Sequence, residues 1–185
     1  MGTIKKGILG GFSGKVGTVV GASWKGIDYI RSLPTTVRNP RTKGQVSQRT
    51  KFSVTMDFLK PLTPVIRQGF SADASGKITA MNAAMSYNLM NAITGAFPDL
   101  VIDYERAVIE RGSLYGAESA AATAAAGEVD FDWDLTTSSN SGVNDSVVLV
   151  AYNADKKDCV YNDSFGERIE GYGSLVVPAT WAGDI

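Results

Sequence analysis

Histidine is absent from the 185 residues, and cysteine occurs once, as Cys159. Without histidine, the sequence excludes Ser-His-Asp and Cys-His catalysis and most zinc sites. A single cysteine excludes an internal disulfide, a thiolate zinc cluster and a redox pair. Catalysis would have to use carboxylates, lysine, tyrosine or a bound metal. Since no such constellation stands out, we expect a non-enzymatic protein without a cofactor.

Long apolar runs are also missing, because no eighteen consecutive residues are apolar. A membrane-spanning helix needs about 20 such residues, and we therefore expect no membrane partner. The first residues carry two lysines but no apolar stretch before their glycines, which argues against a signal peptide. The sequence predicts a cytoplasmic protein unless the chain is built into a larger particle.

Acidic residues are scarce at one end of the chain. Residues 1–51 hold ten Lys or Arg and a single acid, a net charge of +9, whereas residues 52–185 hold eight basic and eighteen acidic residues, a net charge of −10. Such segregation of charge indicates which kinds of molecule the chain binds. The basic end is suited to nucleic acid, to another anionic surface, or to the acidic part of another copy.

The opening segment, GGFSGKVGTVVGASWKG, is rich in glycine and contains a Gly-Lys pair. A phosphate-binding P-loop has Gly, four residues, then Gly-Lys-Ser/Thr. That spacing would require glycine at position 9 and a hydroxyl at position 16, where the sequence has Leu9 and Val16. The segment therefore fails both tests for a P-loop.

We interpret the segment instead as a β-hairpin, with a disordered arm as the remaining alternative. Residues 15–22 alternate as one strand, residues 23–26 form the turn, and residues 27–32 form the second strand. Glycines inside a strand mark a bulge or the close approach of another group. Because a small isolated hairpin is marginal in water, we expect this one to need a neighbouring surface.

The chain is predicted to be α+β, with a basic hairpin arm at residues 1–41, helices in residues 42–97 and an antiparallel β-domain in residues 98–185. Thr42 and Gln45 form a capping box that starts a helix at residues 43–60. We expect a short turn at 62–68 and a third helix at 79–94. The expected apolar stripes contain Val46, Phe52, Val54, Met56, Phe58 and Leu59 on the first helix and Ile78, Met81, Met85, Leu89 and Ile93 on the third.

After Pro98, short β-type runs are separated by turn-rich segments. They include residues 100–110, 127–135, 145–153, 157–163, 167–173 and 174–181. This spacing predicts an antiparallel β-sandwich, Ig-like or a partial barrel. The alanine-rich tract 117–126 is expected to be a helical turn or a surface connection.

The run DFDWD places Asp130, Asp132 and Asp134 on one strand face and two aromatic residues on the other. A calcium loop beginning at Asp130 would need Gly and Glu where the sequence has Leu135 and Ser141. A paired-carboxylate glycosidase site lacks a partner motif. The run is typical of a half-buried strand with aromatics inward, although a carboxylate hydrolase or lectin-like binder remains a minor alternative.

The segment NPRTKGQVSQRTKF, with the preceding WKG hairpin, resembles a Bacteroidetes-type domain-of-unknown-function family, number 6266. The resemblance continues through ERGSLYG, VDFDWD, DSVVLVAYN and ERIEGYGSLVVP. The N-P-x-T-x-x-Q-x-x-R-x-x-F part also resembles a segment of some phage virion-associated proteins. The family carries no assigned activity, so the resemblance implies no catalytic residues. Members typically continue past Ile185, which implies a shortened copy or an absent terminal strand.

We expect a structural subunit of a virion or another self-assembling particle. Its basic arm would dock on a neighbouring copy or another structural protein, and repeated contacts of this kind form rings or filaments. Nucleic-acid binding or packaging through the same arm is the less favoured alternative. The predicted interface residues are Trp24, Tyr29, Arg31, Arg38, Arg41 and Arg49, with Asp130, Asp132 and Asp134 as acidic counterparts.

Overall fold

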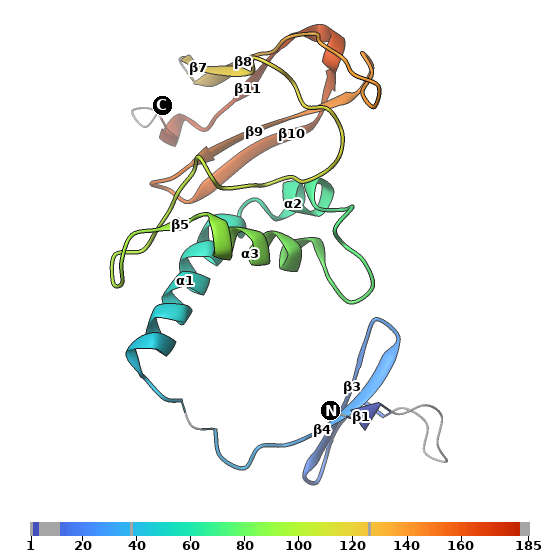
Figure 1. Cartoon of the computed structure of the whole chain (residues 1–185), viewed down its shortest axis with the longest axis vertical. Helices are drawn as coiled ribbons and strands as arrows, with labels where there is room; N and C mark the ends of the chain where they lie inside the picture. The colour runs from blue at the N-terminus through green and yellow to red at the C-terminus, as the bar shows by residue number, and fades with distance from the viewer. Residues whose placement is uncertain (1, 4–11, 38, 126, 182–185) are drawn as a thin grey trace. The chain divides into compact units, whose positions relative to one another are not determined.

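The computed structural model describes residues 2–3, 12–37, 39–125 and 127–181 (Figure 1). The chain divides into two compact units, unit 1 at residues 1–46 and unit 2 at residues 47–185. Helices and antiparallel strand pairs occur together, which confirms the predicted α+β class. Among the described residues, no sheet closes into a barrel.

Unit 1 is a four-stranded antiparallel sheet with the order β1-β4-β3-β2. Its strands are β1 (Gly2–Thr3), β2 (Gly14–Val16), β3 (Val19–Trp24) and β4 (Ile27–Ser32). The prediction of one strand over residues 15–22 is wrong, because the chain turns at Gly17, whose φ is 57°, and β2 folds back onto β3. The arm is therefore built from two successive hairpins.

The second hairpin turn is shorter than the predicted Ser23–Gly26. Ser23 and Trp24 belong to β3, and the turn consists of Lys25 and Gly26, whose φ angles are 47° and 76°. Two consecutive positive φ angles are the signature of a type I′ turn, whose twist matches that of the paired strands. The turn therefore fixes the pairing of Trp24 with Ile27.

Unit 2 contains most of α1 (Lys43–Leu59), then α2 (Thr63–Gly69) and α3 (Ala80–Asn91). The predicted helix start at Lys43 is confirmed. At the start of α3, the Thr79 hydroxyl accepts a hydrogen bond from the Asn82 backbone N–H at 3.2 Å, which is an N-cap. These helices share a core whose buried residues are Phe58, Leu59, Leu62, Ile66, Phe70, Ala80, Ala84 and Met85.

The buried faces of both long helices agree only in part with the predicted stripes, of which Phe58, Leu59 and Met85 are buried as expected. On α1 the buried positions are Thr55, Phe58 and Leu59, while Phe52 is 52% exposed. On α3 the buried residues are Ala80, Ala84, Met85 and Asn88. Thr55 can be buried because its hydroxyl donates to the Lys51 carbonyl at 2.9 Å. Polar residues whose hydrogen bonds are satisfied therefore occupy buried positions that a purely apolar pattern does not predict.

Two small sheets stack beyond the helices in unit 2 (Figure 1). The inner sheet pairs β9 (Ser146–Asn153) with β10 (Asp158–Glu167). The outer sheet has the order β11-β8-β7, formed by Tyr172–Val176, Glu128–Asp132 and Ala121–Ala125. Short β5 (Ile93–Thr94) and β6 (Val101–Ile102) pair beside α3, and single 3-10 turns occur at Arg168–Glu170 and Ala179–Trp181.

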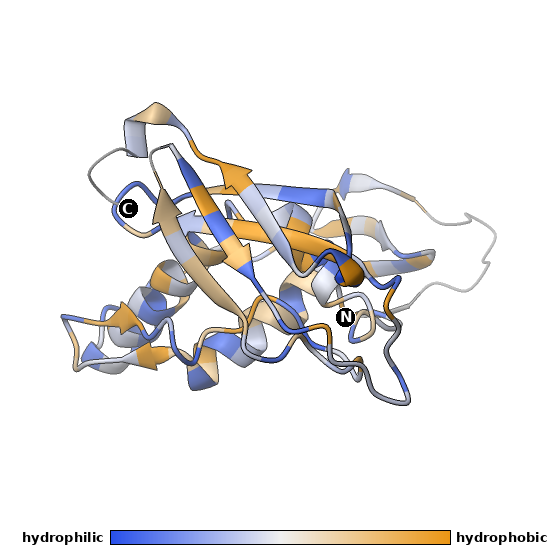
Figure 2. Ribbon diagram, turned by 90° about the horizontal axis from the view of Figure 1, so that it is seen from above, coloured by the Kyte–Doolittle hydropathy of each residue, from blue (hydrophilic) through white to orange (hydrophobic). Residues whose placement is uncertain are grey.

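The inner sheet is covered on both faces. Val150 and Tyr152 pack against the helical core, whereas Leu149 belongs to a second buried cluster with Trp133 and Leu175 of the outer layer. This double burial explains the almost continuous apolar run of β9, whereas β8, with the sequence EVDFD, alternates polar and apolar residues (Figure 2). Unit 2 is thus a helical layer, an inner sheet and an outer sheet in succession.

Three predicted segments differ in the structure. The alanine tract is not a helical turn, because Ala121–Ala125 forms the edge strand β7 on β8. Pairing with β8 here overrides the helix preference of alanine. Most of residues 100–110 is irregular, because the Asn88 side chain binds the Val108 backbone. Residues 168–170 form a 3-10 turn that ends at Gly171 with φ 70°.

Candidate interaction surfaces

One face of the arm sheet carries cationic and aromatic side chains together. In the register, Lys15, Val20 and Arg31 form one row, Ala22 and Tyr29 a second, and Trp24 and Ile27 a third. Directly paired residues in antiparallel strands project from the same face. We call these seven residues the arm face. Three of the predicted interface residues lie on it: Trp24, Tyr29 and Arg31.

The opposite face of the arm is closed locally by its own chain. A Cβ atom at Gly21 would lie 2.2 Å from the Phe12 carbonyl oxygen and 2.7 Å from its ring carbons. Gly21 is buried although it lies in a thin sheet. The predicted close approach at a strand glycine is therefore confirmed, with Phe12 of the same chain as the approaching residue. The arm face is the side that Phe12 does not cover, and Trp24 on it is 50% exposed.

The other predicted basic residues lie elsewhere. Arg38 is outside the described residues. Arg41 is exposed before α1 begins, and Arg49 is on α1 in unit 2. Arg49 therefore belongs to a different unit from the arm face.

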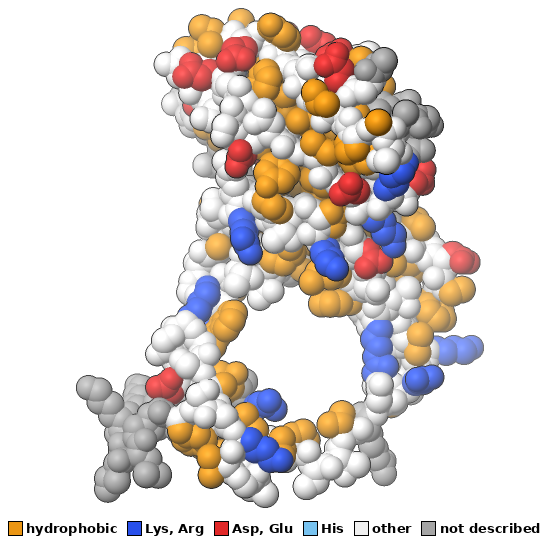
Figure 3. All heavy atoms as spheres, turned by 180° about the vertical axis from the view of Figure 1, so that it is seen from behind, with side chains coloured by type: hydrophobic (Ala, Val, Ile, Leu, Met, Phe, Trp, Pro, Cys, Tyr) orange, Lys and Arg blue, Asp and Glu red, His pale blue; other side chains and the backbone are white. Residues whose placement is uncertain are grey.

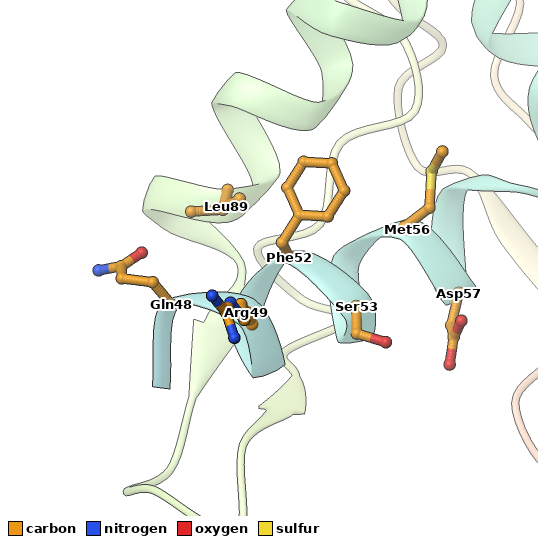
Figure 4. Close-up of a pocket in the computed structure, with 7 residues that line it drawn as sticks. All are labelled: Gln48, Arg49, Phe52, Ser53, Met56, Asp57 and Leu89. Atoms are coloured by element: carbon orange, nitrogen blue, oxygen red, sulfur yellow. The ribbon is translucent and has the colours of Figure 1, made fainter. Parts of the chain in front are cut away.

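Arg49 lines an open groove of about 600 Å³ between α1 and α3. Phe52 and Met56 stand on one side of α1 beside Leu89 of α3, whereas Ser53 and Asp57 point the other way (Figure 4). Asp57 pairs with Lys157 of the β9–β10 turn at 2.9 Å. The groove is lined by three apolar side chains, those of Phe52, Met56 and Leu89, and by the polar or charged residues Gln48, Arg49, Ser53 and Asp57.

The predicted acids lie on or next to the outer sheet. Asp130 and Asp132 alternate on β8 with Phe131, which packs into the second core cluster, so the predicted arrangement with aromatics inward is confirmed there. Asp134 is exposed beyond the end of β8, where its backbone N–H donates to the Glu118 carbonyl at 3.0 Å. Acidic side chains gather over this end of unit 2 (Figure 3).

Glu128 is a further acid that the motif DFDWD does not include. It lies on β8 two residues before Asp130, and its Oε2 accepts a hydrogen bond from the Ser174 hydroxyl at 2.9 Å. The face shared by Glu128, Asp130 and Asp132 also carries Tyr172 and Val176 of β11 through the register. Residues this far apart in sequence come together only through strand pairing.

The inner layer supplies little reactive chemistry. Burial raises the pKa of the Cys159 thiol to about 11 and that of the Tyr152 hydroxyl to about 12. Both shifts favour the protonated form, which is the poor nucleophile. Within the described ranges, no three acidic or thiol side chains gather in a way that could hold a metal ion. None of the helices in those ranges has the length and apolarity needed to cross a membrane.

Comparison with known proteins identifies the family of the chain. Residues 11–185 match the model of a family of unknown function, DUF6266. The chain belongs to DUF6266. This match confirms the resemblance identified from the sequence, and it spans β2, β3 and β4 of the arm and all of unit 2. No curated protein and no solved structure matches the chain. DUF6266 membership assigns no activity to the chain.

Proposed function

We propose that this DUF6266 protein is a non-enzymatic structural subunit of a repeating assembly of the phage-virion type. The arm face docks on a neighbouring copy and links the subunits. The observation that carries the proposal is the placement of Lys15, Arg31, Tyr29 and Trp24 on one face, while Phe12 covers the other face at Gly21. Aromatic residues and arginine are the residue types enriched at interfaces.

The arm has little to stabilise it by itself. The buried hydrophobic residues of the described chain run from Phe58 to Trp181, and none is in the arm. A small sheet without a core gains too little burial to offset the entropy of ordering its residues. Contact with another molecule would supply the missing burial, and this supports docking as the role of the arm.

Charge supports a second copy as the partner. The arm lies in the basic part of the sequence, and residues 52–185 have a net charge of −10. Complementary charge accelerates encounter and sets orientation more than it adds affinity. We therefore expect association that weakens as salt is added.

Size exclusion with light scattering tests the proposal at about 0.1 M and about 1 M salt, between which the screening length falls from about 10 Å to about 3 Å. We expect oligomers at low salt that dissociate at high salt. Arg31→Gln on the arm face should weaken association several-fold. Ser32→Glu is the matched control, because it makes the same change in net charge at an exposed neighbour on the other face. A monomer at both salt concentrations contradicts the proposal.

Nucleic-acid binding is the second candidate, because cations beside Trp24 and Tyr29 are also the pattern of a single-strand stacking surface. A mobility-shift titration with single-stranded DNA separates the two functions. Tight binding with a steep salt dependence, lost in Trp24→Ser, would favour the nucleic-acid role. Self-association that is unaffected by added DNA would favour the structural role.

A further inference from the structure

The outer sheet of unit 2 presents three cross-strand rows on its solvent side. The register aligns Tyr172 with Asp132 and Ala121, Ser174 with Asp130 and Thr123, and Val176 with Glu128 and Ala125. The inward residues of these strands include Phe131 and Leu175 of the second core cluster. The rows therefore face away from the core, and we call these nine residues the outer face.

Two apolar side chains are exposed on the outer face beyond what core packing requires. Tyr172 is 68% exposed and Val176 is 73% exposed. They border a line of carboxylates formed by Glu128, Asp130 and Asp132. None of the fifteen residues in β7, β8 and β11 is Lys or Arg. Exposed apolar residues beside uncompensated charge of one sign mark an interaction site.

We propose that the outer face is the receptor for the arm face of a second copy; this inference rests on the proposed function. The two faces match in chemistry. Trp24 and Ile27 share one row, and Lys15 and Arg31 share another row two rows away. When the first row packs on the row of Val176, the second meets the row of Asp132 and Tyr172. The two faces also match in extent, since each spans three rows spaced about 7 Å apart along the strands. Two such sheets stack face to face at about 10 Å.

The position of the outer face favours a neighbouring copy. Within unit 2, the inner sheet separates the outer sheet from the helices (Figure 1). The arm joins unit 2 through α1, on the helical side. The helical layer, to which the arm is attached, and the outer face thus lie on opposite sides of unit 2. A contact between two different surfaces repeats head to tail through successive copies.

The contact area predicts a weak single contact. Three strands across and three rows along cover on the order of 300 Å² per partner from strand spacings, well below the roughly 800 Å² of a standard interface. Each copy offers one arm and one receptor, so every link of the assembly has the strength of a single contact. Assembly should therefore depend steeply on protein concentration and on salt.

Sedimentation velocity on two complementary variants of the full chain tests the assignment. The receptor variant is Asp130→Asn/Asp132→Asn/Tyr172→Ser, and the arm variant is Arg31→Gln/Trp24→Ser. Each should be monomeric alone at the concentrations at which the unaltered chain assembles. Mixed in equal amounts, they should form a heterodimer that grows no further, because one intact arm meets one intact receptor.

The controls separate this inference from the proposed function. Asp99→Asn/Asp155→Asn removes two exposed carboxylates outside the outer face and should leave assembly unchanged. If the arm variant dissociates but the receptor variant still assembles, the receptor assignment is overturned and the proposed function stands. If the unaltered chain stays monomeric, both are overturned. A mixture of the two variants that forms no heterodimer also contradicts the assignment.

Discussion

Arg168 is buried, and its guanidinium binds several backbone carbonyls. Its Nη1 donates to the Gly116 and Thr136 carbonyls at 3.1 and 3.0 Å, and its Nη2 donates to the Tyr115 carbonyl at 2.6 Å. Its Nε lies 3.7 Å from Asp145. One guanidinium thus holds together three irregular segments that lack regular pairing of their own.

Replacement of Arg168 should be severe. Arg168→Met leaves three carbonyls and Asp145 without their donor, and we expect a loss of about 3–5 kcal/mol in the free energy of unfolding. Arg168→Lys should recover part of this loss, because lysine keeps the charge but not the planar fork. Urea denaturation measures both changes. Arg106→Gln, at an exposed ion pair with Asp103, should cost no more than about 1 kcal/mol.

Asn88 fastens the irregular segment after β6 to α3. Its side-chain amide donates to the Val108 and Ala84 carbonyls at 2.8 and 2.9 Å, and its carbonyl oxygen accepts from the Val108 N–H at 2.9 Å. Asn88→Asp removes both donors and buries a charge, so we expect a loss of at least about 2 kcal/mol. Asn91→Asp, on the exposed side of α3, should cost far less in the same denaturation assay.

Cys159 should react slowly with thiol reagents. Its pKa is raised by burial from 9.0 to about 11, so the thiolate fraction near pH 8 is roughly a hundredfold below that of the unfolded chain. A folded pKa above the unfolded value stabilises the fold fully below about pH 9, and this contribution is lost as pH rises towards 11. Labelling of the native protein and of the urea-unfolded protein tests this. Equal rates would contradict the burial of the thiol.

At the scale of elements, the buried and the exposed apolar residues of α1 should contribute very differently to stability. Leu59→Ala should cost about 2–5 kcal/mol, because Leu59 is fully buried in the helical core. Phe52→Ser should cost no more than about 0.5 kcal/mol, because Phe52 is exposed at the groove. Thermal unfolding of the two variants compares them. A larger loss for Phe52→Ser would support the stripe expected from the sequence.

The sequence predicts which segments form helices and strands better than it predicts which sides of them are buried. The start of α1 and the alternation of β8 follow from local chemistry, namely a helix-starting segment and aromatics between acids. The buried sides of α1 and α3 do not follow fully, because Thr55 on α1 and Asn88 on α3 are buried through hydrogen bonds that a hydropathy pattern ignores. Strand β7 is missed for a related reason: only its pairing with β8 makes an alanine tract extended.

Of the candidate surfaces, too, the sequence predicts some features and not others. The segregation of charge, and Trp24, Tyr29 and Arg31 as an aromatic and cationic set, are visible in the sequence. That these three share one face depends on the two-residue turn at Lys25 and Gly26, which sets the register. Tyr172 and Val176 carry no sequence signal, because they join the β8 acids only across strands.

At the scale of the whole molecule, all the buried hydrophobic side chains of the described chain lie in unit 2. Residues 47–185 expressed alone should therefore unfold cooperatively, with a midpoint within a few degrees of the full chain. A peptide of residues 1–46 should show no cooperative transition, since a small sheet without a core is marginal. Circular dichroism with heating measures both. If the fragment melts far below the full chain, the arm stabilises unit 2 of its own molecule, and an arm engaged in that way is not available to a neighbouring copy.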